Sequence, residues 1–201
     1  MAFSFFFRDV PALDVAADAM IEQTRGQMRV RVWVAGCAMG QEVYTLAILL
    51  SEKMNYFGFQ NLNIIASDIE KNFGEVVTNG EYEWGDIERI PDKLRERYFS
   101  PTGRPDIFAV NSLLRSHVTF VHHDLLSLKP VCEDVHLIIC KNVLLHFHPE
   151  ERIEVFRMFH KTLAAGGVLA NENTQKLPFE VQGLFSQISN DSQVYRKVEA
   201  S

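Results

Sequence analysis

Short apolar segments with the pattern of β-strands alternate along this chain with longer segments of helical periodicity. Segment 29–35 alternates and is rich in β-branched residues, whereas segment 135–140 has apolar residues at five of its six positions, as expected for a strand buried on both faces. This alternation predicts an α/β fold with a mostly parallel sheet and helices on both faces. The predicted strands are 29–35, 61–68, 117–122, 135–140 and 168–171, and the predicted helices are 10–25, 42–54, a stretch ending near 77, and 149–163.

Two segments depart from this alternation. Residues 80–116 are interrupted by glycines and prolines, which predicts an insertion with turns, a short helix near 92–98 and a small hairpin. Residues 185–198 predict a C-terminal antiparallel hairpin turning at Asn190-Asp191. Because no repeat or low-complexity tract is visible, we expect residues 1–201 to form one domain with a reduced insertion subdomain at about 80–116. Gly166 and Gly167 are expected to end the helix that Pro149 begins.

Composition excludes several classes of protein. With 47% hydrophobic and 23% charged residues, the 201-residue chain has the balance of an ordinary soluble globule. No apolar run approaches the roughly 18 residues of a membrane span, so we expect no membrane insertion. The net charge of −6, spread without long blocks, argues against general nucleic-acid binding. The start lacks a signal peptide's basic flank and the three cysteines lack a disulfide or metal spacing, which favours a cytoplasmic location.

Chemistry-bearing residues follow the first two predicted strands. Gly36 and Gly40 allow a sharp turn and a close approach of backbone to ligand, and Glu42 begins the next helix. That carboxylate would repel a dinucleotide pyrophosphate but attract the ammonium of an amino acid. Asp68 ends the second strand, where an acid can take both hydroxyls of a ribose. Together they suggest S-adenosylmethionine, although a plain tight turn with a capping glutamate explains the first motif equally well.

Five segments, in the same order along the chain, resemble motifs of the CheR-type chemotaxis receptor methyltransferases. The opening Ser4-Phe5-Phe6-Phe7-Arg8-Asp9 is similar to T-x-F-F-R-[DE], and segment 32–44, VWVAGCAMGQEVY, is similar to V-W-S-A-G-C-S-T-G-E-E-P-Y-S. Segment 66–69 matches A-[ST]-D-I, segment 140–147 resembles C-R-N-V-x-I-Y-F, and segment 163–169 resembles L-x-P-G-G-x-L. The segments span nearly the whole chain, so the match is specific.

The resemblance implies a class I, Rossmann-like methyltransferase fold and transfer of a methyl group from S-adenosylmethionine to glutamate side chains of chemoreceptors. It implies that Ser4 and Arg8 lie at the donor and the acceptor carboxylate, and that His146 lies near the transferring methyl. The other implied donor-binding residues are Gly36, Glu42, Asp68, Asp124, Leu125, Lys141 and Asn142. The implied partner is a protein acceptor such as the cytoplasmic region of a chemoreceptor, and the product is S-adenosylhomocysteine.

Several positions depart from the family pattern. His146 replaces a tyrosine, Lys141 replaces an arginine, Asp124 replaces an asparagine, and segment 172–175 reads Glu-Asn-Thr-Gln instead of G-H-S-E. The match begins at Ser4, so the family's N-terminal helical domain is expected to be absent. These departures keep two alternatives open: a non-catalytic module that binds S-adenosylmethionine or S-adenosylhomocysteine and regulates a partner, and a methyltransferase redirected to a small-molecule acid.

Other reactive residues are assigned no chemistry. Histidines 122, 123, 146 and 148 could be imagined as zinc ligands, but no cysteine pattern or H-E-x-x-H supports them, so no metal site is predicted. No base lies next to Cys37 in the sequence, which argues against a nucleophilic thiol there.

Overall fold

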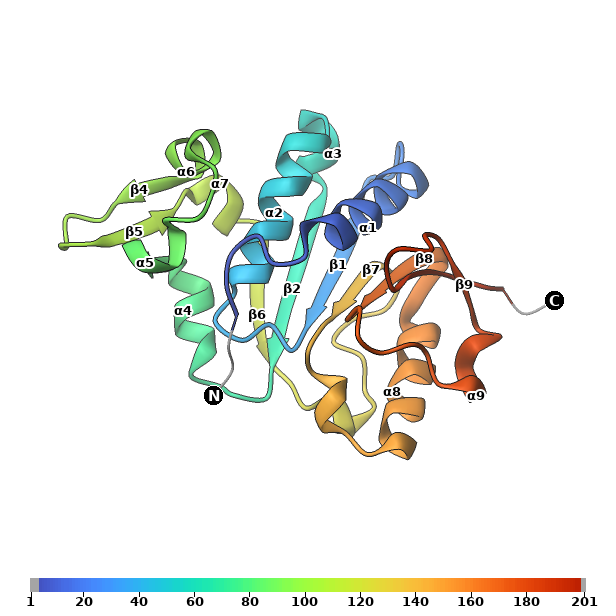
Figure 1. The fold of residues 1–201 in the computed structure, drawn as a ribbon. Coiled ribbons are helices and arrows are strands. Elements are labelled where there is room, and N and C mark those ends of the chain that lie inside the picture. Colours follow the sequence, from blue (N-terminus) through green and yellow to red (C-terminus); the bar gives the residue numbers. More distant parts are fainter. Residues whose placement is uncertain (1–3, 200–201) are drawn as a thin grey trace.

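The computed structural model describes residues 4–199, which are organised around a seven-stranded sheet (Figure 1). The strand order is β6-β2-β1-β7-β8-β10-β9. Neighbouring strands from β6 to β8 run parallel, and β10 runs antiparallel between β8 and β9. These strands are β1 Val30–Ala35, β2 Leu62–Asp68, β6 Val118–His122, β7 Val135–Cys140, β8 Leu163–Asn171, β9 Phe185–Gln187 and β10 Val194–Lys197.

The chain starts this sheet in the middle, and that order places the site. From β1 it builds outward through β2 to β6, and then it returns to the other side of β1 as β7. The connections therefore leave β1 and β7 in opposite directions. At such a switch point the loops at the carboxyl ends of the two strands diverge and leave a crevice that a ligand can enter.

Helices cover both faces of the sheet, as the sequence predicted. Val32 and Val34 of β1 belong to an apolar cluster with α1 Val10–Gln23 and α2 Gln41–Lys53, whereas the intervening Trp33 belongs to a second cluster with α8 Pro149–Thr162. Successive side chains of a strand point to opposite faces, so the two clusters are two layers of core. Every residue of β7 is buried, which confirms the prediction for this strand.

The segment between β2 and β6 carries a second, three-stranded antiparallel sheet of order β3-β5-β4, which projects beside α2 and α4 (Figure 1). A hairpin was expected here, and α6 spans the expected residues. Phe6 packs edge-on against Tyr82 and Phe99 of this sheet, with ring centroids 4.9 and 5.4 Å away. The elements are α4 Phe73–Asn79, β3 Glu81–Glu83, α5 Trp84–Ile87, α6 Asp92–Tyr98, β4 Phe99–Pro101, β5 Ile107–Val110 and α7 Ser112–Arg115.

The prediction that Gly166 and Gly167 end a helix is wrong. Helix α8 already ends at Thr162, and both glycines lie inside β8. They form an irregularity in the pairing of β8 with β7, where the register shifts between Val135 and Leu137. Gly166 has a φ of +66°, and a Cβ on Gly167 would lie 2.9 Å from a backbone carbonyl oxygen, so the bulge requires both residues to be glycine.

The C-terminal antiparallel hairpin formed by β9 and β10 is as predicted, and its loop turns at Asn190 and Asp191. The short elements α3 Tyr56–Gln60, α9 Phe179–Gln182, η1 Leu125–Ser127 and η2 Leu144–His146 were not predicted. None of the helices within residues 4–199 is long and apolar enough to cross a membrane.

Candidate active site at the carboxyl edge of the sheet

A cavity of about 660 Å³ opens where β1, β2, β6 and β7 end. Its volume lies within the roughly 300–1,000 Å³ of small-molecule sites. All ten residues predicted to bind the donor or to act in catalysis line it: Ser4, Arg8, Gly36, Glu42, Asp68, Asp124, Leu125, Lys141, Asn142 and His146. The structure thus brings together residues from five separate segments, whereas their individual roles stay predictions.

The loop after β1 forms the floor of this cavity. The backbone N–H groups of Gly36 and Cys37 both donate to the carbonyl oxygen of Ser67, at 2.8 and 2.9 Å, which ties the loop to the end of β2. Gly36 has a φ of +78°, and a Cβ there would overlap the side chain of Val143 in the loop after β7. Only glycine therefore allows the loops of β1 and β7 to meet at this point.

Asp68 is oriented by its own backbone surroundings. Its Oδ2 accepts a hydrogen bond from the Ala38 N–H at 2.9 Å, and its Oδ1 accepts one from the Glu70 N–H at 3.0 Å. Each carboxylate oxygen has a second lone pair, so two acceptor positions stay available toward the cavity. A vicinal diol such as a ribose matches that arrangement.

Glu42 lies in the first turn of α2, and burial raises the pKa of its carboxyl. The nearby ammonium of Lys141 opposes that rise, with Nζ 3.7 Å from Oε2, and the charge of Arg8 opposes it more weakly. Arg8 itself lies over the ring of Phe5, 5.6 Å from the ring centroid. A buried carboxylate beside an open cavity is a strong site for an incoming ammonium group.

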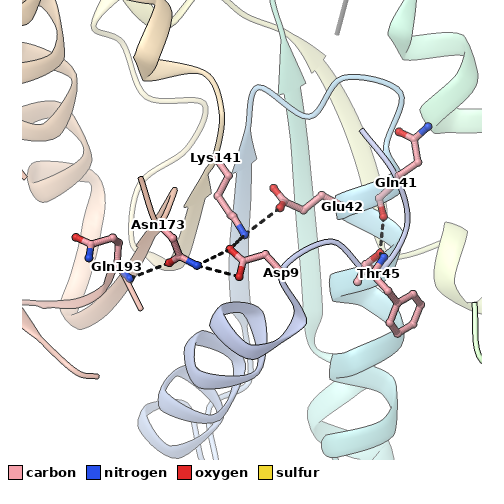
Figure 2. Close-up of polar contacts among 8 residues, drawn as sticks. Asp9, Gln41, Glu42, Thr45, Lys141, Asn173 and Gln193 are labelled. Atoms are coloured by element: carbon pink, nitrogen blue, oxygen red, sulfur yellow. Dashed lines mark hydrogen bonds and ion pairs between the residues drawn. The ribbon is translucent and has the colours of Figure 1, made fainter. Parts of the chain in front are cut away.

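Asp9 is a polar residue of this region to which the sequence analysis assigned no role. Its carboxylate lies between the Lys141 ammonium and the Asn173 amide, as Figure 2 shows. The Lys141 Nζ is 2.5 Å from Asp9 Oδ2, which is closer than its 3.7 Å to Glu42. Only the family motif F-F-R-[DE] marked this position, and the motif does not say which cation the acid meets.

The opposite end of the cavity is more apolar. Leu125 is 6% exposed, and Asp124 caps the short η1 helix by accepting a hydrogen bond from the Leu126 N–H at 2.8 Å. Ile69 and Phe73 also line this end and were not predicted, because apolar residues after a strand carry no signature of ligand binding. A flat heterocycle fits such a wall better than a charged group does.

The described residues offer little support for metal or thiol chemistry. Among residues 4–199, no group of three or more His, Cys, Asp or Glu side chains is arranged to hold a metal ion. Burial, and to a lesser extent the Asp68 carboxylate, raise the pKa of the Cys37 thiol, so this thiol stays protonated and is a poor nucleophile.

Two features define a class I methyltransferase-type domain. The first is the sheet order, in which the antiparallel strand β10 is next to last. The second is the cavity, which has Asp68 at the end of β2 and Glu42 at the start of α2. The family described as CheR methyltransferase, SAM binding domain, matches residues 2–194, where SAM is S-adenosylmethionine. The chain belongs to this family. Its curated relatives agree with that assignment.

Three relatives illustrate the range of the similarity. The chain is 31% identical to an uncharacterized 104.1 kDa protein of Rhodobacter capsulatus, covering 95% of this chain and 20% of that protein. It is 32% identical to a chemotaxis protein methyltransferase of Listeria innocua, covering 83% and 62%. It is 30% identical to chemotaxis protein methyltransferase 1 of Pseudomonas aeruginosa, covering 89% and 69%. The chain therefore spans about a fifth of the first relative and less than two thirds of the second.

Proposed function

We propose that this domain transfers the methyl group of S-adenosylmethionine to a carboxylate on a protein, giving a methyl ester and S-adenosylhomocysteine. The observation that carries the proposal is the shared cavity, which collects residues from four of the five family motifs, together with Asp124 and Leu125, and has acids suited to the two polar ends of the donor. We further propose that residues 1–201 act as one methyltransferase domain with a reduced insertion subdomain at about 80–116.

In this proposal Asp68 binds the ribose and Glu42 binds the ammonium of the donor, while Leu125 and Phe73 contact the adenine. Asp124, Asn142 and Lys141 complete the donor site. The donor supplies a sulfonium methyl that is already a strong electrophile, so the protein has little proton transfer to perform. Its task is to align the acceptor oxygen, the methyl carbon and the sulfur, which is the kind of positioning that contributes several kcal/mol, about 7–11 at most.

Arg8 is the proposed acceptor-side residue, together with Ser4. A guanidinium beside the acceptor can hold the incoming carboxylate and keep it ionised, and an ionised oxygen is the nucleophile that the reaction needs. During transfer a new O–C bond forms at the acceptor while the C–S bond breaks, and the electron pair of that bond stays on sulfur. His146 lies on the wall of the same cavity and is the proposed residue beside the methyl.

The acceptor is proposed to be the cytoplasmic region of a chemoreceptor. The names of the Listeria and Pseudomonas relatives, which are chemotaxis protein methyltransferases, support this assignment. A cytoplasmic site of action is supported by the three cysteines, which are all free thiols.

Two measurements test the proposal in order. Titration calorimetry with S-adenosylhomocysteine measures donor-site binding, and a radiolabelled methyl donor with chemoreceptor cytoplasmic fragments measures base-labile methyl ester formation. We expect saturable binding and label on the receptor fragment, both of which are lost in Asp68→Ala. Absence of binding would refute the donor site. Binding without transfer to any protein acceptor would refute the activity and favour the two alternatives, a regulatory binding module or a methyltransferase of small-molecule acids.

A further inference from the structure

Lys141 is a buried cation that lies near two carboxylates, those of Asp9 and Glu42. Its side chain is only 3% exposed, and its ammonium lies 2.5 Å from Asp9 and 3.7 Å from Glu42 (Figure 2). Three elements meet at this point: the end of the N-terminal segment, the loop after β7 and the start of α2. A buried ammonium requires a carboxylate partner, and the shorter distance identifies Asp9 as the main one.

The orientation of the Asp9 carboxylate is itself fixed. The backbone N–H of Gln193 donates to Asn173 Oδ1 at 3.3 Å, so the amide nitrogen of Asn173 must face the other way. That nitrogen donates to both oxygens of Asp9, at 3.0 and 3.1 Å. Asp9 has a φ of 54°, a left-handed conformation that aspartate adopts more readily than most residues. The carboxylate is thus held in place by Asn173 as well as by Lys141.

This arrangement matters because Lys141 and a ligand ammonium compete for Glu42. If Lys141 paired fully with Glu42, the Glu42 carboxylate would already be neutralised when a ligand arrived. Because Asp9 binds Lys141 more closely, the negative charge of Glu42 is left facing the cavity. At Glu42 the charge of Lys141 lowers the carboxyl pKa and the charge of Asp9 raises it, so Asp9 partly offsets the effect of Lys141 on this group.

We propose that Asp9 is a positioning residue for donor binding: it holds the Lys141 ammonium so that the Glu42 carboxylate stays available for the ammonium of the donor. This inference rests on the proposed function. Asp9 itself contacts no donor atom in this scheme, and it acts through Lys141.

The test compares two ligands in Asp9→Asn. Asparagine keeps the size of the side chain, one acceptor for Asn173 and the tolerance of a left-handed backbone. S-adenosylhomocysteine carries the ammonium, whereas 5′-methylthioadenosine has the same nucleoside without the amino acid part. By calorimetry, Asp9→Asn is expected to weaken S-adenosylhomocysteine binding by about 10- to 100-fold, within the range of couplings between charged neighbours. Binding of 5′-methylthioadenosine is expected to change by less than about twofold.

A second pair of variants isolates the route through Lys141. In the Lys141→Met background the cation is gone, so adding Asp9→Asn is expected to cost less than about threefold in affinity for S-adenosylhomocysteine. Asp18→Asn is the matched control, because it removes a carboxylate from helix α1, which Asp9 immediately precedes, at an exposed position paired with Lys53. Its affinity for both ligands is expected to equal that of the wild-type protein.

The outcomes separate this inference from the proposed function. A wild-type protein that fails to bind S-adenosylhomocysteine refutes the donor site as a whole. If the wild-type protein binds, three results overturn the role of Asp9: an unchanged affinity in Asp9→Asn, an equal loss for both ligands, or the same loss with and without Lys141.

Discussion

Replacement of Asp68 by alanine is the most direct perturbation of the proposed donor site. Each oxygen of this carboxylate accepts one backbone N–H and retains one lone pair for a ribose hydroxyl. A hydrogen bond to a charged group contributes about 1.5–3 kcal/mol, so two of them contribute about 3–6 kcal/mol. At about 1.4 kcal/mol per factor of ten, Asp68→Ala is expected to weaken S-adenosylhomocysteine binding by roughly 100-fold to 10,000-fold.

The Asp68→Ala protein is expected to remain folded. It removes the acceptors of two backbone N–H groups, those of Ala38 and Glu70, at a cost of about 1 kcal/mol each. A domain of ordinary stability has about 5–15 kcal/mol available, so the variant is expected to unfold at a lower temperature but to be folded at 25 °C. Loss of affinity and loss of fold are therefore separable in this variant.

Calorimetry with S-adenosylhomocysteine and a thermal melt of the ligand-free protein measure the two effects. Glu70→Ala is the matched control, because Glu70 is an exposed acid two residues further on that does not line the cavity. Asp68→Asn keeps one acceptor oxygen and is expected to bind with an intermediate affinity. A folded Asp68→Ala protein that binds within about threefold of wild type would refute the ribose assignment.

Three further perturbations test other parts of the site. Arg8→Ala is expected to lower methyl transfer by about 100-fold or more while changing S-adenosylhomocysteine affinity by less than about tenfold, because its proposed partner is the acceptor; equal losses would contradict that role. Burial raises the pKa of Glu42, and a protonated carboxyl cannot hold an ammonium. Affinity is therefore expected to fall as the pH is lowered through that raised pKa, and Glu42→Gln is expected to bind weakly without this pH dependence; a flat wild-type profile in calorimetry would exclude Glu42. Gly36→Ala is expected to lower the free energy of unfolding, measured with denaturant, by about 2–4 kcal/mol. Gly26→Ala is the control and is expected to lower it by about 1–2 kcal/mol, because Gly26 has the same φ of +78° but a Cβ there would have no neighbour within 4 Å. Equal losses of stability would show that the Val143 side chain can move away from a Cβ at position 36 without destabilising the protein.

The fold could be predicted from the sequence where the local pattern of residues agrees with the tertiary structure. Residues 135–140 form a strand with the predicted bounds, because a run of apolar residues this short is typical of a strand buried on both faces. The glycine pair 166–167 was misread because glycine serves both to end helices and to form bulges. Only the pairing of β8 with β7, whose residues lie far away in the chain, decides between these uses. A local pattern cannot contain that information.

The same limit separates the predicted and missed parts of the site. Residues at strand ends were predictable, because the carboxyl ends of parallel strands meet at one edge of a sheet. The contact of Asp9 with Lys141 joins residues 132 positions apart, and its contact with Asn173 joins residues 164 apart. Asn173 lies in a segment that departs from the family motif, and in the structure its side-chain amide donates hydrogen bonds to Asp9. Such pairings depend on side-chain positions that no single motif specifies.

Several residues in the segments around the cavity have a left-handed backbone conformation. Phe7, Asp9, Ala38 and Asn142 all have positive φ values, between 47° and 59°, and all four lie in segments that border the cavity. Asparagine and aspartate tolerate this conformation, whereas phenylalanine and alanine do so at a cost of about 1–2 kcal/mol. Those two are the residues whose N–H groups are held by side chains, Phe7 by Thr45 at 3.0 Å and Ala38 by Asp68 at 2.9 Å. Asp68 therefore stabilises a strained loop before any ligand arrives, and the same bond fixes the direction of its remaining lone pairs. A carboxylate oriented in this way need not be reorganised when a ribose binds, which is the physical basis for the large affinity loss expected on its removal.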